Sequence, residues 1–288
     1  MLMEERKYYS VRNALNQGKL HLDLDMLKHL FLAIYSDFRD KYYFQEAFGY
    51  ECVDAGFVPG TTGRDTEAFF LIKLRKQNLW PIETMIDNYS EDDLFDVIEL
   101  LHDLIAKPID GYYHSWNQCG WHYQTFDEPA GQSEFRQKIN DILRDYREGY
   151  ELSEAGEILS IGDTGLESLL KAEIPEFDPD NIDGRLKQAV SKFHRYKSSD
   201  EERREAVRAL ADILEYLRTK YGTHLIRKDE AYLFDIANNF GIRHHNPRQK
   251  TNYDADVWLP WVFYVYLASI HLSIRLNQRT SSEEDMTR

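Results

Sequence analysis

The sequence predicts an all-α protein with one small β-hairpin, and three observations carry this prediction. Apolar residues recur at spacings of three and four over several long segments, which places them on one face of a helix. Residues that cap helix N-termini stand directly before several of these segments, as Ser90 does before three acidic residues. Two short runs of β-prone residues flank a turn that holds Gly156. The 288 residues, 42% of them hydrophobic, suffice for one large domain or two modest ones.

Four helices are predicted in an N-terminal module that covers residues 1–148. The first begins at Leu24, and the second begins near Arg64 and ends before Trp80-Pro81. The third follows Ser90, and its apolar stripe continues to Ile105. The fourth covers residues 134–147. The pattern therefore predicts an acidic, helical N-terminal module.

The rest of the chain is predicted to form a hairpin, a linker, a second helical module and a tail. Residues 149–180 hold the hairpin and a linker rich in proline and acidic residues. Residues 181–277 hold four helices, of which Asp183 and Asp200 are expected to cap the first two. Residues 278–288 are expected to be disordered.

Charge also divides the chain into two modules. Residues 81–180 contain 6 basic and 24 acidic residues, so their net charge is 6 − 24 = −18. Residues 181–228 contain 12 basic and 7 acidic residues, a net charge of 12 − 7 = +5. The whole chain carries a formal charge of −15, which excludes a general nucleic-acid coat protein.

The sequence indicates a soluble, cytoplasmic protein. The two cysteines, Cys52 and Cys119, are too few for a disulfide framework or for a zinc site built from cysteine alone. The N-terminal residues contain acidic residues and tyrosines where a signal peptide needs an apolar stretch. The longest apolar run, 258–274, is interrupted by Pro260 and is shorter than the about 20 residues that a membrane span needs. No membrane association is expected.

One short peptide, Arg243-His244-His245-Asn246, is the strongest candidate for chemistry. It lies in a predicted loop between two helices of the basic module. Arginine binds phosphate in a bidentate manner and histidine transfers protons near neutral pH, so this peptide suits cleavage of a phosphodiester. The alternative is that Arg243 and Asn246 cap helix ends while the histidines form local hydrogen bonds.

The second module resembles the HEPN superfamily, and more narrowly the C-terminal part of bacterial abortive-infection proteins of the AbiJ type. The likeness lies in a basic helix with Arg203, Arg204 and Arg208, followed by the FGIRHHN peptide and a buried closing helix. It implies a dimeric four-helix bundle that acts as a metal-independent endoribonuclease without a cofactor. In that family the arginine steadies the phosphate and the histidine serves the 2′-hydroxyl or the leaving group, and the basic helix would bind RNA.

The family motif places four to six residues between the arginine and the histidine, whereas the histidines here follow Arg243 directly. Arg218 and His224 match the family spacing, so they form an alternative catalytic pair. The resemblance therefore implies one of two functions. The first is an RNase of bacterial antiviral defence or of a toxin-like system, and the second is a noncatalytic sensor or scaffold. In the second case the acidic module would bind a protein partner.

A homodimer is predicted through the closing helix. Its aromatic residues lie around most of the helix circumference. One four-helix bundle is not expected to cover all of this apolar surface, so a second subunit is expected to cover the rest. These aromatic residues are Trp258, Trp261, Phe263, Tyr264 and Tyr266.

A second group of residues, His114, Cys119 and His122, lies among aromatic residues at 112–123. Three such ligands and a water would form a catalytic-type zinc site, and Cys-x2-His is an allowed spacing. A fourth ligand is missing from this stretch. We therefore expect no metal, and an aromatic loop that packs on the helices or offers a flat surface to bases or to a partner.

Overall fold

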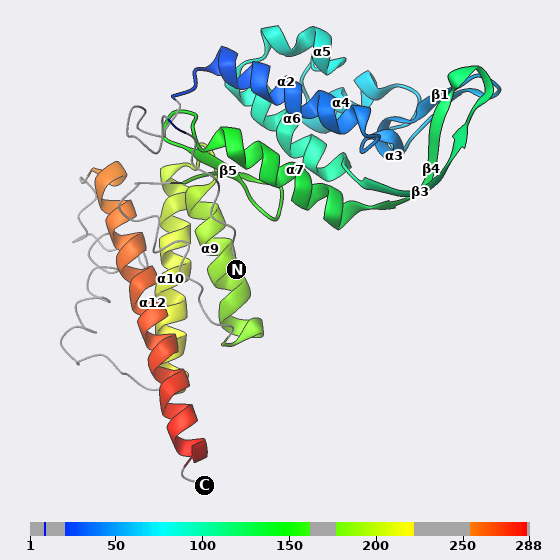
Figure 1. The fold of residues 1–288 in the computed structure, drawn as a ribbon. Helices are drawn as coiled ribbons and strands as arrows, with labels where there is room; N and C mark the ends of the chain where they lie inside the picture. Colours follow the sequence, from blue (N-terminus) through cyan, green and yellow to red (C-terminus); the bar gives the residue numbers. More distant parts are fainter. Residues whose placement is uncertain (1–8, 10–20, 162–176, 222–253, 287–288) are drawn as a thin grey trace. The chain divides into compact units, whose positions relative to one another are not determined.

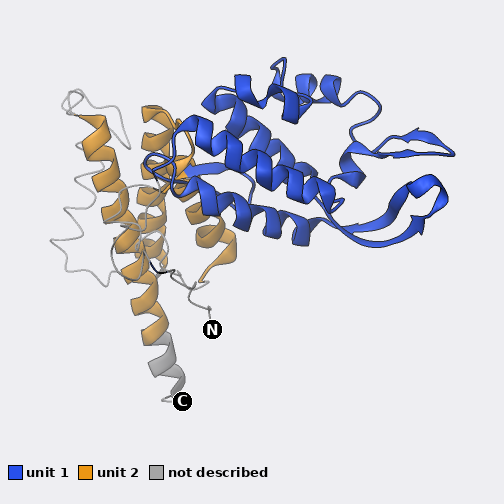
Figure 2. Ribbon diagram, turned by 45° about the horizontal axis from the view of Figure 1, so that its top comes forward, with its two compact units in different colours: residues 1–159 blue, residues 160–288 orange. Residues whose placement is uncertain are grey.

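The computed structural model describes residue 9 and residues 21–161, 177–221 and 254–286 (Figure 1). The chain divides into two compact units, Met1–Leu159 and Ser160–Arg288 (Figure 2). The division falls at the end of the predicted hairpin, and the hairpin packs on the N-terminal unit. The described part is mostly helical, which confirms the mostly-α prediction.

Three helices form the body of the N-terminal unit: α2 (Leu24–Asp40), α6 (Glu91–Leu104) and α7 (Glu128–Leu143). Helix α7 contacts both of the others. Aromatic and aliphatic side chains from all three are fully buried, among them Phe31, Tyr35, Leu94, Phe135 and Ile139. Shorter elements surround them: α3 (Gln45–Phe48), α4 (Thr66–Leu74), α5 (Ile82–Met85) and η1 (Ile86–Asn88).

The predicted cap of α6 is confirmed. The Ser90 hydroxyl accepts a hydrogen bond from Asp93 N at 3.2 Å, and the Asp93 carboxylate accepts one from Ser90 N at 2.9 Å. This reciprocal capping box satisfies two backbone donors at the start of the helix. Asp65 begins α4 in a similar way by accepting from Ala68 N at 2.9 Å.

The described residues form three two-stranded hairpins, whereas the sequence predicted one. The predicted hairpin is present as β5 (Tyr150–Leu152) and β6 (Ile158–Ser160). The unpredicted hairpins are antiparallel: β1 (Tyr50–Cys52) pairs with β2 (Gly56–Val58), and β3 (Lys107–His114) pairs with β4 (Gly120–Asp127). The prediction of an aromatic loop at 112–123 is therefore wrong. A β-bulge at 108–111 and exposed side chains at successive positions of β3 remove the alternation that marks a half-buried strand.

Three long helices pack together in the C-terminal unit: α9 (Gly184–His194), α10 (Asp200–Tyr221) and α12 (Ala255–Met286). Helix α10 contacts both neighbours, and one core unites residues of all three. The phenyl rings of Phe193 on α9 and Phe263 on α12 stack in it with centroids 4.0 Å apart. Helix α12 continues to Met286, past residue 277 where the sequence analysis ends the bundle.

Neither predicted cap of this unit caps its helix. The Asp183 carboxylate accepts a hydrogen bond from Phe177 N at 3.1 Å and makes no cap to α9. A short π-helical turn, η3 (Pro179–Asp183), precedes that helix. Ser199 caps α10 by accepting from Glu202 N at 3.3 Å, which makes Asp200 the first helical residue. A serine and an aspartate side by side are both good N-caps, so the sequence alone does not distinguish them.

One face of the closing helix is buried in its own unit. Phe263, Tyr264 and Tyr266 are at most 6% exposed, so the prediction that these three side chains need a partner subunit to cover them is wrong. Trp258 and Trp261 are 40% and 45% exposed. In the part of the chain that the structure describes, one helix segment, Ala255–Arg279, is long and apolar enough to span a membrane, a test that buried core helices also pass.

Candidate functional site

The predicted Arg/His loop lies outside the described residues. Arg243, His244, His245 and Asn246 all belong to the connection 222–253 between α10 and α12. His224 of the alternative pair lies in the same connection. Their roles therefore stay predictions.

The arginines of α10 lie beside carboxylates. Arg203 Nη1 is 3.4 Å from an oxygen of Asp256, and Arg204 is 3.6 Å from Glu201. Arg218 is 3.6 Å from Glu215, one turn away. Arg208 is also on this helix. Two of the three predicted RNA-binding arginines, Arg203 and Arg204, thus have an anionic neighbour in the protein itself.

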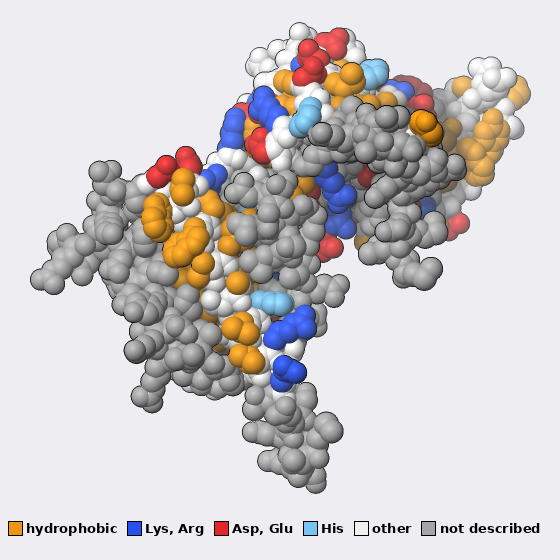
Figure 3. Space-filling view, turned by 60° about the vertical axis from the view of Figure 1, so that its left-hand side comes forward, with side chains coloured by type: hydrophobic (Ala, Val, Ile, Leu, Met, Phe, Trp, Pro, Cys, Tyr) orange, Lys and Arg blue, Asp and Glu red, His pale blue; other side chains and the backbone are white. Residues whose placement is uncertain are grey.

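The N-terminal unit exposes large hydrophobic side chains on its β3–β4 hairpin. Trp116 at the tip is 69% exposed, and two adjacent tyrosines on β3 are about half exposed. Figure 3 shows hydrophobic side chains gathered on this outlying part of the unit, at the upper right. We define the hairpin surface as the exposed side chains of Tyr113, Trp116 and Trp121; Tyr113 and Trp121 pair across the two strands, on the face opposite Tyr112 and the two histidines.

Charge on the β1–β2 and β3–β4 hairpins is predominantly negative. Glu51, Asp54, Asp110 and Asp127 contribute four carboxylates, whereas Lys107 contributes the one basic side chain of these strands and their turns. The Lys107 ammonium is 2.8 Å from the Glu134 carboxylate on α7, which neutralises it. The two hairpins together therefore carry exposed aromatic side chains and a net negative charge.

On the same two hairpins, the structure brings together four side chains with metal-binding atoms: Cys52, His114, Cys119 and His122. Their donor atoms all lie within 4.8 Å of one another. Cys52 Sγ is 3.8 Å from Nδ1 of His114, and Cys119 Sγ is 3.2 Å from Nε2 of His122. His122 is buried, and the other three side chains are partly buried. We call this group the Cys/His cluster.

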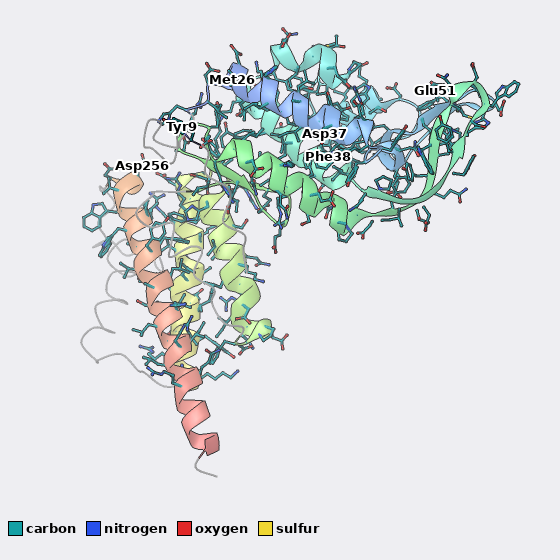
Figure 4. All side chains as sticks on the ribbon, in the orientation of Figure 1. Tyr9, Met26, Asp37, Phe38, Glu51 and Asp256 are labelled. Atoms are coloured by element: carbon teal, nitrogen blue, oxygen red, sulfur yellow. The ribbon has the colours of Figure 1, made fainter. Side chains whose placement is uncertain are left out.

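The two hairpins and their turns place these four residues. Cys52 ends β1 and His114 ends β3, while His122 lies on β4. In the register of the β3–β4 ladder, His114 pairs with Gly120 and Tyr112 pairs with His122, so the two histidines share one face of the hairpin. The turn η2 (Trp116–Gln118) then returns the chain, and Cys119 Sγ reaches within 3.7 Å of the Glu51 carbonyl oxygen on β1. Figure 4 shows Glu51 beside the β3–β4 hairpin.

Each histidine of the cluster has a polar partner on the ring nitrogen that faces away from the nearest cysteine. Asp54 Oδ2 lies 3.2 Å from Nε2 of His114, and the Tyr112 hydroxyl lies 3.1 Å from Nδ1 of His122. Burial and the neighbouring His114 ring lower the pKa of His122 below its ordinary value, which favours the neutral imidazole. A neutral imidazole is the form that binds a metal ion.

A buried glutamine fixes the β3–β4 hairpin to the helical body. Gln45 Nε2 on α3 donates to the Trp121 carbonyl at 2.9 Å, and Gln45 Oε1 accepts from Tyr123 N at 2.7 Å. The side-chain amide thus continues the hydrogen bonding of β4. This bidentate contact holds the hairpin in one orientation against α3.

Cys52 is the member of the cluster that the sequence analysis missed. It lies 62 residues before His114, and no spacing rule connects the two. The available signal was that the chain has only two cysteines, one of which lies in the Cys-x2-His stretch. The missing fourth donor is thus supplied by the neighbouring hairpin.

The Cys/His cluster and the hairpin surface lie on the same pair of hairpins in the N-terminal unit. Arg243, His244, His245 and Asn246 belong to the second predicted module, residues 181–277. The function of these residues follows from their own chemistry. The chain matches no protein-family model, no curated protein and no solved structure.

Proposed function

We propose that this chain is a noncatalytic sensor or scaffold whose N-terminal unit docks a protein partner rich in lysine and arginine. One observation carries the proposal: the two hairpins combine exposed tyrosine and tryptophan rings with carboxylates that have few basic neighbours on the same hairpins. Aromatic residues of this kind dominate the binding energy of many protein interfaces.

The chemistry of the hairpin surface selects a cationic partner. Lysine and arginine side chains bind the faces of tryptophan and tyrosine rings through cation–π contacts. Glu51, Asp54 and Asp110 would add ion pairs at the rim of such an interface. The same carboxylates repel the phosphates of a nucleic acid, so they favour protein over RNA as the partner.

The anchoring of the hairpin also supports a binding role. The two hydrogen bonds of Gln45 hold β4 against α3, and the ring of Trp121 stacks on that of Tyr123 with centroids 5.6 Å apart. A preorganised surface loses little conformational entropy on binding. Exposed aromatic residues on a rigid hairpin are therefore suited to recognition.

Binding of labelled peptides to the full chain tests this function. The probes are a fluorescein-labelled arginine- and lysine-rich peptide, a glutamate-rich peptide of equal length and a labelled oligouridine RNA. Fluorescence anisotropy is expected to show binding of the basic peptide alone, weakened by salt. Trp116→Ala is expected to weaken it at least about tenfold, because an exposed aromatic anchor is lost.

Ile72→Ala is the matched control, since Ile72 is 62% exposed and belongs to α4 of the same unit, not to a hairpin. It is expected to leave peptide binding unchanged. Tighter binding of the RNA than of the basic peptide, or equal peptide affinity of Trp116→Ala and the wild type, would contradict the proposal.

Bacterial antiviral defence is the context that the family resemblance supports, and an endoribonuclease is the second candidate function. The packing of α9, α10 and α12 around one core is compatible with a HEPN-like bundle, and residues 243–246 lie between α10 and α12 in the sequence. In this candidate, Arg243 binds the scissile phosphate and His244 or His245 transfers the proton, with Asn246 positioning the substrate.

Incubation of the full chain with total RNA and with transfer RNA, with and without EDTA, tests the second candidate. Cleavage that persists in EDTA and is abolished by Arg243→Ala supports it. The double variant His244→Ala/His245→Ala identifies the histidines, and His224→Ala tests the alternative pair with Arg218. Absence of cleavage in all reactions leaves the noncatalytic proposal as the better account.

A further inference from the structure

We propose that Cys52, His114, Cys119 and His122 together bind one zinc ion in a closed, four-ligand structural site. Two thiolates and two imidazoles are the donor set that Zn²⁺ favours in structural sites. Two thiolates also neutralise the charge of the ion, which matters for a group that includes a buried histidine. This proposal reverses the sequence-based expectation of no metal, because the structure adds the fourth donor.

The distances within the cluster fit a tetrahedral ion. Zinc binds sulfur at about 2.3 Å and nitrogen at about 2.0–2.1 Å, so a tetrahedral angle separates S and N ligands by about 3.6 Å. The two S-to-N separations, 3.8 Å for Cys52–His114 and 3.2 Å for Cys119–His122, lie on either side of that value. No pair of donor atoms is farther apart than 4.8 Å, so only small side-chain movements are needed.

The outer contacts decide which nitrogen of each histidine faces the ion. Asp54 next to Nε2 of His114 accepts a hydrogen bond from that nitrogen and leaves Nδ1 free to coordinate. The Tyr112 hydroxyl lies 3.1 Å from Nδ1 of His122, and when it accepts a hydrogen bond from Nδ1–H it leaves Nε2 for the metal. In both rings the nitrogen so released is the one that lies closest to a cysteine sulfur. A carboxylate or hydroxyl behind a ligating histidine is a usual feature of metal sites.

The position of the site gives it a structural role. Cys52 comes from the β1–β2 hairpin, and the other three ligands come from the β3–β4 hairpin and its turn. One ion therefore cross-links two hairpins on whose four strands His122 is the one buried residue. Two-stranded hairpins are marginally stable alone, so the ion would contribute directly to their folding. Four protein ligands leave no coordination position for a catalytic water.

Metal analysis of the purified full chain tests the site without reference to any partner. Protein produced in zinc-supplemented medium and purified under reducing conditions is expected to hold about one zinc per chain. Cys52→Ser, Cys119→Ser and His114→Ala are each expected to lose it. His29→Ala is the matched control, because His29 is an exposed histidine on α2, and it is expected to retain full zinc content.

A conservative variant keeps the test valid if ligand loss unfolds the hairpins. His114→Cys replaces the imidazole by a thiolate, which is another zinc-binding group. This variant is therefore expected to retain zinc where His114→Ala does not. Cobalt substitution adds a spectroscopic readout: the wild type is expected to show the intense visible bands of tetrahedral Co²⁺ and a thiolate charge-transfer band.

Three outcomes would overturn the zinc site. They are a reduced, folded wild type with neither stoichiometric zinc nor tetrahedral cobalt bands, zinc content unchanged by the double variant Cys52→Ser/Cys119→Ser, and a Cys52–Cys119 disulfide in the protein as purified under reducing conditions. None of them depends on peptide binding, so failure of this site and failure of the docking proposal are distinguishable.

Discussion

The carboxylate of Asp54 lies 3.2 Å from Nε2 of His114, so the turn between β1 and β2 contacts the last residue of β3. This contact orients the His114 ring with Nδ1 toward Cys52. Asp54 therefore supports the Cys/His cluster without belonging to it.

Asp54→Asn is expected to weaken zinc binding about 10- to 100-fold, the usual loss when a partner behind a ligating histidine is removed. The reason is that the amide oxygen accepts a weaker hydrogen bond from Nε2–H than the carboxylate does. Competition with a chromophoric chelator measures the affinity. Asp110→Asn, an exposed carboxylate on β3, is the control and is expected to leave zinc affinity unchanged. Equal losses in both variants would assign the effect to general surface charge.

Gln45→Ala is expected to destabilise the N-terminal unit by about 1–3 kcal/mol. The substitution leaves the Trp121 carbonyl and the Tyr123 amide without their buried partner. Thermal unfolding measures the loss of stability, and hydrogen exchange of the backbone amides shows whether the β3–β4 hairpin opens more often. Gln124→Ala, an exposed glutamine on β4, provides the comparison and is expected to cost little. A Gln45→Ala protein as stable as that control would show that the hairpin does not depend on this contact.

The helices of both units were predictable because their signals are local. The apolar stripe of α6 and its Ser90 cap lie within 15 consecutive residues, 90–104, and each supports the same element. The β3–β4 hairpin was not predictable in this way, because its exposed aromatic residues follow no alternation and its stability depends on contacts with α3 and β1.

The candidate site was predictable only in part for the same reason. His114, Cys119 and His122 are close in sequence, and the Cys-x2-His spacing identified them as metal-binding residue types. Cys52 joins them through the packing of two hairpins, a relationship that no local pattern contains. The aromatic residues around them were expected either to pack on the helices or to offer a flat surface to bases or to a partner, and several of them are exposed.

The homodimer remains a prediction, now limited to the exposed part of α12. The indole rings of Trp258 and Trp261 lie 5.6 Å apart and are both about 40% exposed or more. Light scattering is expected to give a dimer mass for the wild type at micromolar concentration and a monomer mass for Trp258→Ser/Trp261→Ser. Leu272→Ser, which alters another exposed side chain of the same helix, is expected to remain dimeric. A wild type that is monomeric at that concentration contradicts dimerisation through this helix.

His194 is expected to make the C-terminal unit less stable as the pH falls. The side chain is 7% exposed at the end of α9, where it packs edge-on against Phe263 with ring centroids 5.4 Å apart. Burial, assisted by the positive charge of Arg203 and opposed by a hydrogen bond with the Ser160 backbone, lowers the pKa of His194 to about 4. The unfolded chain binds this proton near the ordinary value of 6.5. Between these two pKa values the unfolded state holds a proton that the folded state lacks, so the free energy of unfolding decreases as the pH is lowered.

The loss of unfolding free energy that His194 causes is small above about pH 6.5 and reaches about 3 kcal/mol near pH 4. Urea unfolding at about pH 7 and about pH 4.5 measures it, with Trp258 and Trp261 as fluorescent reporters of this unit in a background where the other tryptophans are replaced by phenylalanine. His194→Gln is expected to be less stable at neutral pH because a buried ring is lost, but to have a smaller pH dependence than the parent. His29→Gln alters an exposed histidine of the other unit and is expected to keep the parental pH dependence. If His194→Gln and the parent lose the same free energy over this pH range, the proton responsible binds elsewhere in the chain.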